Sequence, residues 1–309
     1  MIKEIGWKQP LYILPFDHRN TFSKELFSST RILNEYQIDK IKEVKQIIYE
    51  AFLMSLDRGM PKEYAAILVD EQYGDKIIKD AILRSINVCL SVEKSGQLEF
   101  DFEYGSDFAT HIQKYNPTFC KVLVRYNPES NPEINKRQLQ KLAVLNNFCK
   151  ANNYKFLAEI LIPPTDRQLK DLNNDLMQYE MSLRPKLTVR TIFEMQNSEV
   201  EPDIWKIEGM YGSQDYNNVV KQAKAGIREH VGIIVLGKGD SREHVEKWIS
   251  TGAGVEGVIG FAVGRTVFLK SIKEFVKETI DKEMCIRKIC ADFMYFYNLF
   301  ESSKKSSQG

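Results

Sequence analysis

Short hydrophobic segments alternate along the chain with longer, charged, amphipathic segments, and no linker interrupts the alternation. The short segments are rich in β-branched and aromatic residues, which is typical of buried strands. Alternation of strands with helices favours a parallel sheet, because parallel strands need crossover connections. The pattern predicts strands at residues 11–16, 65–69, 86–92, 120–126, 155–161, 204–207, 232–236 and 257–261.

The amphipathic segments between these strands have the length expected of crossover helices. They are predicted at residues 38–57, 135–152, 167–178, 217–224 and 242–250. Eight strand and helix units close a barrel, so we predict a single (β/α)8 TIM-barrel domain over residues 1–300. A doubly wound open sheet uses the same alternation, but it more often carries a G-x-G-x-x-G turn after the first strand, which this chain lacks.

Two segments do not fit a pattern of one helix after each strand. Residues 188–197 predict a second helix before the sixth strand, and residues 267–304 are too long for a single closing helix. We therefore expect an extra C-terminal helix outside the barrel. The last residues, 301–309, contain no hydrophobic anchor and are predicted to be disordered.

Composition narrows the possible partners and the compartment. The 43 basic and 42 acidic residues leave a formal charge of +1, so no overall field attracts nucleic acid or an anionic membrane. No segment approaches the roughly 18 hydrophobic residues of a membrane span, and the first ten residues do not resemble a signal peptide. The five cysteines show no paired spacing, which favours a reducing compartment. We predict a cytoplasmic protein with neither nucleic-acid nor membrane partners.

Charged residues recur at the predicted strand ends, where the active site of such a barrel lies. They include Asp17, His18, Arg19, Asp70, Glu71, Glu93, Lys94, Lys121, Glu159, Lys206 and Glu208. Because side chains alternate along a strand, Lys206 and Glu208 should point into the barrel, while Trp205 and Ile207 face the helices.

Lys206 is the candidate with the clearest chemistry. Burial disfavours an ammonium, and the neutral amine is the form that attacks a carbonyl carbon. Lys121 and Glu159 are predicted on the two preceding strands, where an ammonium could lower the pKa of Lys206 and a carboxylate could transfer protons. The alternative is structural, with Lys206 reaching solvent or a salt bridge and the other two forming a buried ion pair.

Glycine-rich turns follow the last two strands, the usual position of a phosphate site in these barrels. One contains Gly237 and Lys238, and the other contains Gly264 and Arg265. Glycine allows close approach of the backbone, and the cations favour an anion. Either turn alone is weak evidence, because many such turns need glycine only for its conformation, but the two together predict a phosphate site.

The remaining polar residues are secondary candidates. His18 and Arg19 could bind substrate, although His18 could equally be a structural histidine beside Asp17. The histidines lack zinc-binding spacing, so no metal or cofactor is predicted. Asp70, Glu71 and Glu93 could hold a divalent cation, but salt bridges to Lys94 or Arg125 would be the commoner outcome.

The strand-end motifs resemble a known family across residues 12–268. They are similar to those of class I tagatose-1,6-bisphosphate aldolases, and more closely to the aldolase-like domain fused to the sugar kinase of bacterial inositol catabolism. The matching motifs are FDHR at 16–19, VDEQYG at 69–74, VEKSG at 92–96, KVL at 121–123, LAEIL at 157–161, WKIE at 205–208 and GFAVGRT at 260–266.

The resemblance implies a role for each matching residue. Lys206 would form the Schiff base, Glu159 would transfer protons, and Lys121 with Asp17 would orient substrate hydroxyls. Gly264 and Arg265 would hold a phosphate. This chain also departs from the tagatose enzymes at two places. After the first strand their sequence resembles Asp-Gln-Arg, where this chain has His18. Their seventh turn resembles Ser-Ala-Gly, where this chain has GKG at 237–239.

These departures favour the inositol-pathway domain. For that domain the resemblance implies cleavage of 2-deoxy-5-keto-gluconate 6-phosphate into a three-carbon ketose phosphate and malonic semialdehyde. We expect a metal-independent class I aldolase acting on this compound or a ketose bisphosphate. The alternatives are a phosphosugar isomerase or epimerase and a noncatalytic phosphosugar-binding regulator. A homo-oligomer is possible by analogy with other barrel enzymes.

Overall fold

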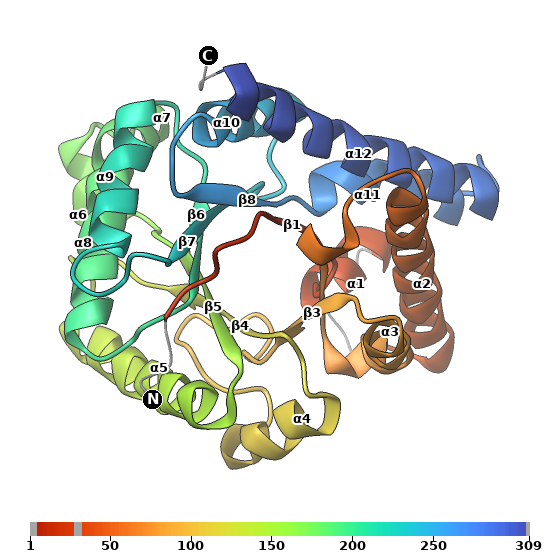
Figure 1. The fold of residues 1–309 in the computed structure, drawn as a ribbon, viewed down its shortest axis with the longest axis horizontal. Coiled ribbons are helices and arrows are strands. Elements are labelled where there is room, and N and C mark those ends of the chain that lie inside the picture. The colour runs from red at the N-terminus through yellow and green to blue at the C-terminus, as the bar shows by residue number, and fades with distance from the viewer. Residues whose placement is uncertain (1–4, 28–32, 307–309) are drawn as a thin grey trace.

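Eight parallel strands close into a barrel surrounded by helices, which confirms the predicted (β/α)8 fold (Figure 1). The computed structural model describes residues 5–27 and 33–306. Each strand pairs with its neighbours in chain order, and the first pairs with the last. The strands are β1 (Leu11–Pro15), β2 (Ala65–Val69), β3 (Asn87–Ser91), β4 (Phe119–Arg125), β5 (Lys155–Leu161), β6 (Ile204–Glu208), β7 (Gly232–Leu236) and β8 (Val258–Ala262).

The helices lie outside the barrel, and several begin at side chains that cap free backbone N–H groups. Asn34 caps α2 with a reciprocal contact to Gln37, and Asn131 caps α5 just before Pro132. The α-helices are α1 (Asn20–Phe27), α2 (Glu35–Asp57), α3 (Glu71–Leu83), α4 (Phe108–Tyr115), α5 (Pro132–Asn152), α6 (Asp166–Asp171), α7 (Leu176–Gln178), α8 (Arg184–Asn197), α9 (Ser213–Ala223), α10 (Arg242–Ala253), α11 (Arg265–Val276) and α12 (Lys282–Ser306). Shorter helical turns are Lys62–Tyr64, Gly105–Asp107 and the π-helix Tyr179–Leu183.

The interior of the barrel is hydrophobic at one end and polar at the other. A buried hydrophobic layer contains Phe119, Leu157 and Ile204. Because inward-facing residues recur every second position, Lys121, Glu159 and Lys206 form the next layer toward the C-terminal ends of the strands. Trp205 and Ile207 instead pack in the cluster between strands and helices, as predicted. The strand alternation therefore places charged side chains directly above a dry core.

The predicted helix at residues 167–178 is wrong as a single element. It is divided into α6 and α7, because Asn173 and Asn174 both adopt left-handed backbone conformations, with φ of 53° and 59°. Asparagine tolerates this region and commonly ends helices there. The second helix before β6 is confirmed, although α8 begins at Arg184 rather than Thr188.

The extra C-terminal helix is also confirmed. In Figure 1, α12 lies outside the barrel and runs past α10, α11 and α2. It continues to Ser306, so the prediction of disorder is wrong for residues 301–306. Phe300 is fully buried, and the Tyr12 hydroxyl donates a hydrogen bond of 2.5 Å to Glu301, which anchors the last turns. Residues 307–309 lie outside the described part.

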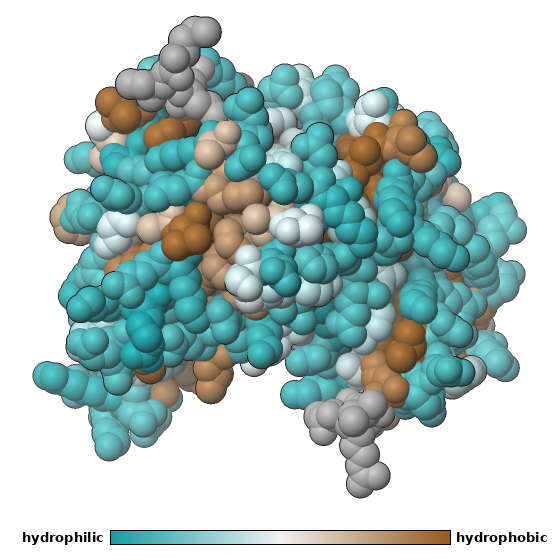
Figure 2. Space-filling view, turned by 90° about the horizontal axis from the view of Figure 1, so that it is seen from below, coloured by the Kyte–Doolittle hydropathy of each residue, from teal (hydrophilic) through white to brown (hydrophobic). Residues whose placement is uncertain are grey.

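The outer surface and the hydropathy of the helices bear on whether a helix could span a membrane. Most of the face shown in Figure 2 is hydrophilic, with hydrophobic residues in small separate groups. In the described residues, every helix is either too short or too polar to cross a bilayer.

The packing of α12 predicts its contribution to stability. The ring of Phe293 is fully buried between Phe52 and Phe261, with centroid distances of 6.1 and 6.0 Å. Phe293→Ala should lower the free energy of unfolding by about 3–5 kcal/mol through lost burial and a cavity. Urea denaturation checks this value. Met284→Ala, at an exposed position of the same helix, should change stability by less than about 1 kcal/mol; equal losses in both variants would contradict the packing.

Candidate active site

A cavity of about 240 Å³ opens at the C-terminal end of the barrel. All ten residues predicted for the site line it: Asp17, His18, Arg19, Lys121, Glu159, Lys206, Gly237, Lys238, Gly264 and Arg265. These residues come from β4, β5 and β6, from the segments after β1, β7 and β8, and from the start of α11. The fold therefore brings together residues that are up to 248 positions apart in the sequence.

Lys121 lies at the centre of a buried ionic cluster. Its side-chain nitrogen is 2.8 Å from a carboxylate oxygen of Asp17, 2.6 Å from Glu93 and 3.0 Å from Glu159. Only 1% of Lys121 is exposed. An ammonium has three protons to donate, so these three contacts match its hydrogen-bonding capacity.

The cluster shifts the pKa values of its members in different directions. Burial alone would lower the pKa of Lys121, but Asp17, Glu159 and Glu93 raise it well above its usual range. Burial opposes ionisation of Asp17 and Glu159 as well, yet the neighbouring ammonium groups hold both pKa values below normal. At neutral pH Lys121 is therefore a cation, and Asp17 and Glu159 are anions.

Lys206 contacts fewer carboxyl groups than Lys121 does. Its nitrogen lies 3.0 Å from the same oxygen of Glu159 that contacts Lys121, so Glu159 bridges the two lysines. Glu159 and Lys206 are opposite each other in the β5–β6 register. Only 4% of Lys206 is exposed, and Glu159 is its one ionic partner within the described residues.

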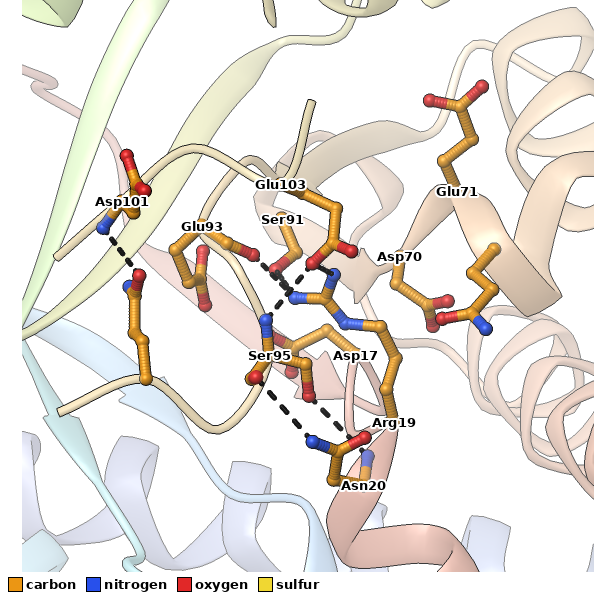
Figure 3. A network of polar contacts seen from close by, with 12 residues as sticks. Asp17, Arg19, Asn20, Asp70, Glu71, Ser91, Glu93, Ser95, Asp101 and Glu103 are labelled. Atoms are coloured by element: carbon orange, nitrogen blue, oxygen red, sulfur yellow. Dashed lines mark hydrogen bonds and ion pairs between the residues drawn. The ribbon is translucent and has the colours of Figure 1, made fainter. Parts of the chain in front are cut away.

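A second network holds the loop after β3 against the loop after β1 (Figure 3). Arg19 donates hydrogen bonds to Glu103 at 2.5 Å and to the backbone oxygen of Glu93 at 2.6 Å. The amide of Ser95 also donates to Glu103, at 3.0 Å. Arg19 thus lines the cavity as predicted, but much of its guanidinium is engaged in positioning Glu93.

The two glycine-rich turns meet at the cavity beside the end of β1, since β8 pairs with β1. Arg265 donates to the backbone oxygen of Lys238 at 2.5 Å, which links the turns. Gly264 begins α11 without a capping side chain, and a Cβ there would lie 2.3 Å from the backbone oxygen of Pro15. A free helix N-terminus beside Arg265 is the arrangement that binds anions.

Lys238 is less available than the sequence indicated. Its ammonium is 2.8 Å from Glu208 and 3.2 Å from Glu180, and these carboxylates raise its pKa against the effect of burial. Of the two turn cations, Arg265 is therefore the one without a carboxylate partner among the described residues.

One protein-family model covers nearly the whole chain. The model of a family described as "Uncharacterized protein conserved in bacteria (DUF2090)" matches residues 3–304. The chain belongs to the DUF2090 family. No curated protein sequence matches it.

Solved structures share the fold of this DUF2090 protein at low sequence identity. Cgl0159 from Corynebacterium glutamicum is 14% identical, with a TM-score of 0.59 over 94% of this chain and 88% of that one. A fructose-bisphosphate aldolase from Plasmodium falciparum is 13% identical, with a TM-score of 0.61 over 96% and 98%. A Schiff-base-forming fructose-1,6-bisphosphate aldolase is 12% identical, with a TM-score of 0.56 over 88% and 93%. At these identities the similarity establishes the fold.

The acidic residues considered for a cation do not gather in this DUF2090 structure. Asp70 pairs with the buried Lys45, and Glu71 contacts Lys114 at 2.7 Å, while Glu93 faces Lys121. The expected salt bridges to Lys94 or Arg125 are therefore wrong, because nearer cations take these positions. Within residues 5–27 and 33–306, no group of three or more His, Cys, Asp or Glu side chains could hold a metal ion.

Sequence reasoning missed Arg125 as a cavity residue. It lies on β4 two positions beyond Leu123 and four beyond Lys121, so strand alternation could have placed it on the inward face. Its guanidinium donates to the backbone oxygen of Gln97 at 2.8 Å. Strand β4 is opposite β8 in the barrel order, so Arg125 and Arg265 lie on opposite sides of the cavity.

His18 predicts a pH dependence of stability. Burial lowers its pKa to about 3, against the attraction of Asp17, so the folded protein keeps the ring neutral. The unfolded chain binds a proton below about pH 6.5, so this stability is present above pH 6.5 and is lost as pH falls toward 3. Since His18 is half-buried, we expect a loss of up to about 2 kcal/mol between pH 7.5 and 5.0.

Urea denaturation of wild type and His18→Gln at both pH values measures this difference. The variant should lose less stability than wild type on acidification. An unchanged pH dependence in His18→Gln would show that His18 is protonated in the folded state as well.

Proposed function

We propose that this protein is a class I aldolase that cleaves a phosphorylated keto-sugar or keto-sugar acid through a Schiff base on Lys206. The observation that carries the proposal is the contact between Lys206 and Glu159, buried in a cavity that Gly264 and Arg265 also line. An amine, an adjacent carboxylate and a phosphate-binding element are the parts that this reaction needs.

The two buried lysines differ in their suitability as nucleophiles. Lys121 is held as an ammonium by three carboxyl groups, two of them the ionised Asp17 and Glu159, and an ammonium has no lone pair to attack a carbonyl. Among the described residues, Lys206 has Glu159 as its only carboxylate contact, and that carboxylate is shared with Lys121. Of the two buried lysines, Lys206 therefore has fewer carboxyl contacts and is the candidate nucleophile.

The proposed reaction balances with the groups of the cavity and water. The Lys206 amine adds to the substrate ketone, and loss of water gives an iminium. Glu159, ionised at neutral pH, accepts the proton of the substrate hydroxyl as the carbon–carbon bond breaks. The bonding electrons move into the iminium and form an enamine, while an aldehyde leaves. Protonation of the enamine and hydrolysis release the second product and free Lys206.

The cavity also supports an anionic substrate. Arg265 and the start of α11 would hold a phosphate on one side. Arg125 lies across the cavity, where a second phosphate or a carboxylate would meet a guanidinium without a carboxylate partner among the described residues. This arrangement suits the keto-sugar acid phosphate and the ketose bisphosphate suggested by the resemblance to the inositol-pathway domain and the tagatose enzymes.

Borohydride trapping tests the Schiff base directly. Wild type incubated with dihydroxyacetone phosphate and borohydride should gain the mass of one reduced adduct, mapped by peptide mass spectrometry to Lys206. Lys206→Ala should give no adduct. Lys79→Ala removes an exposed lysine on α3 and should leave the adduct intact.

Two outcomes would contradict the aldolase. Turnover of a phosphosugar without a trapped adduct would favour the isomerase, in which Lys206 supplies only charge. Binding of a phosphosugar without turnover, equally in wild type and Lys206→Ala, would favour the noncatalytic regulator.

The phosphate position gives a separate prediction. Arg265→Ala should weaken binding of dihydroxyacetone phosphate by about 10- to 100-fold, the effect of losing a charged hydrogen bond of about 1.5–3 kcal/mol. Isothermal titration calorimetry measures the change. Arg167→Ala removes the same charge from a side chain that is 91% exposed and should bind like wild type. Equal affinity in both variants would place the phosphate elsewhere.

A further inference from the structure

Glu93 has an environment unlike that of the other two carboxyl groups around Lys121. One oxygen, Oε1, contacts the Lys121 ammonium at 2.6 Å. The other, Oε2, is buried and has no hydrogen-bond partner among the residues that the structure describes. The residue lines the cavity and is only 6% exposed. A buried carboxylate oxygen without a donor is costly, whereas a protonated oxygen can itself donate to a ligand.

The charges around Glu93 also favour a proton on it. Asp17, Glu93 and Glu159 are three carboxyl groups, whereas Lys121 and Lys206 are two amines. If all five were ionised, the buried cluster would carry one uncompensated negative charge, which is expensive away from water. One proton on a carboxyl group makes the cluster neutral.

The remaining charged groups around Glu93 leave this count unchanged. Arg19, from the loop after β1, contacts the backbone oxygen of Glu93, and Glu103 balances its charge at 2.5 Å (Figure 3). His18 is neutral at pH 7, because burial lowers its pKa to about 3. The neighbouring Lys94 is exposed to solvent.

Among the three carboxyl groups, Glu93 is the one most suited to hold the proton. Burial raises its pKa despite the attraction of Lys121, whereas Asp17 and Glu159 have lowered pKa values. Carboxyl groups whose pKa values are pushed apart in one site are suited to opposite roles, one as acid and one as base.

We propose that Glu93 is the general acid of this site, a neutral carboxyl group in the cavity wall that delivers a proton from Oε2 to the substrate. The proposal rests on the aldolase function proposed above. There, formation of the iminium requires loss of a hydroxyl group from the carbinolamine on Lys206. Glu93 gives its proton to that oxygen, the carbon–oxygen bond breaks, and water leaves as the nitrogen lone pair forms the C=N bond.

The surroundings of Glu93 support both of its protonation states. After the transfer Glu93 is a carboxylate, and Lys121 already lies 2.6 Å from it. Hydrolysis of the final iminium returns the proton, because the attacking water loses it to Glu93. Glu159 remains the base that takes the substrate hydroxyl proton, so the two carboxyl groups flank Lys121 with complementary tasks.

Infrared difference spectroscopy tests whether Glu93 carries the proton, with or without an active enzyme. The spectrum of wild type minus Glu93→Gln at pH 7 should contain the carbonyl band of a protonated carboxylic acid. Glu71→Gln is the control outside the cluster, because Lys114 and His111 lower the pKa of that carboxyl group, and it should remove carboxylate bands only. Glu93→Asp, which keeps an acid, should retain the carboxylic band and shows whether the site tolerates substitution. A difference spectrum for Glu93→Gln without that band overturns the proposal.

Rapid-quench trapping then tests the catalytic role. Glu93→Gln should form the borohydride-reducible adduct about 100-fold more slowly than wild type, the usual scale of general acid catalysis. The wild-type rate of adduct formation should fall as pH rises through the pKa of Glu93, and the variant should lack this fall. Adduct formation at the wild-type rate in Glu93→Gln overturns the role.

The two proposals fail in different ways. If wild type forms no adduct at all, the aldolase function and the catalytic step of Glu93 are both refuted, while the infrared spectrum still decides where the proton lies. If wild type forms the adduct but Glu93→Gln is indistinguishable from it, the aldolase stands and Glu93 is only a structural partner of Lys121.

Discussion

The structure of the site depends on one buried ammonium. Lys121 lies inside the barrel with three carboxyl groups around it, contributed by β5 and by the loops after β1 and β3. Removing a charge from water costs several kcal/mol, and only close, well-directed partners offset that cost. Each partner is therefore held in place by Lys121, and Lys121 is tolerated in the interior only because the partners are there.

This constraint connects the fold to the chemistry. Strand pairing sets Glu159 opposite Lys206, so a carboxylate that binds Lys121 also reaches Lys206. The loops add what the strands cannot supply, since Arg19 and Glu103 fix the backbone at Glu93. The barrel thus provides the spacing between charged groups, and the loop contacts determine which oxygen of each carboxyl group remains available.

Much of this arrangement follows from local sequence patterns. The eight strands were predicted to within about two residues, because each is a short run of hydrophobic residues bounded by polar ones. The inward orientation of Lys206 and Lys121 follows from the two-residue repeat of a strand. The position of the glycine turns follows from their place after the last two strands.

What could not be predicted depends on contacts between distant segments. Nothing near Asp70 in the sequence indicates that Lys45 would neutralise it, and nothing near Arg19 indicates Glu103, 84 residues later. The interruption at Asn173 and Asn174 depends on two left-handed residues within an otherwise helical pattern. Tertiary packing sets both these ion pairs and this interruption, and the periodicity of hydrophobic residues does not encode it.

The same reasoning explains why no separate role for Glu93 could be predicted from the sequence. At the end of a strand it looks like one more acidic residue, equivalent to Glu71 or Asp70. In the folded protein Glu71 is satisfied by Lys114 and Asp70 by Lys45, whereas Glu93 shares the Lys121 ammonium with two other carboxyl groups. The chemical character of a carboxyl group is thus set by how many partners compete for one cation, and that number exists only after the barrel closes.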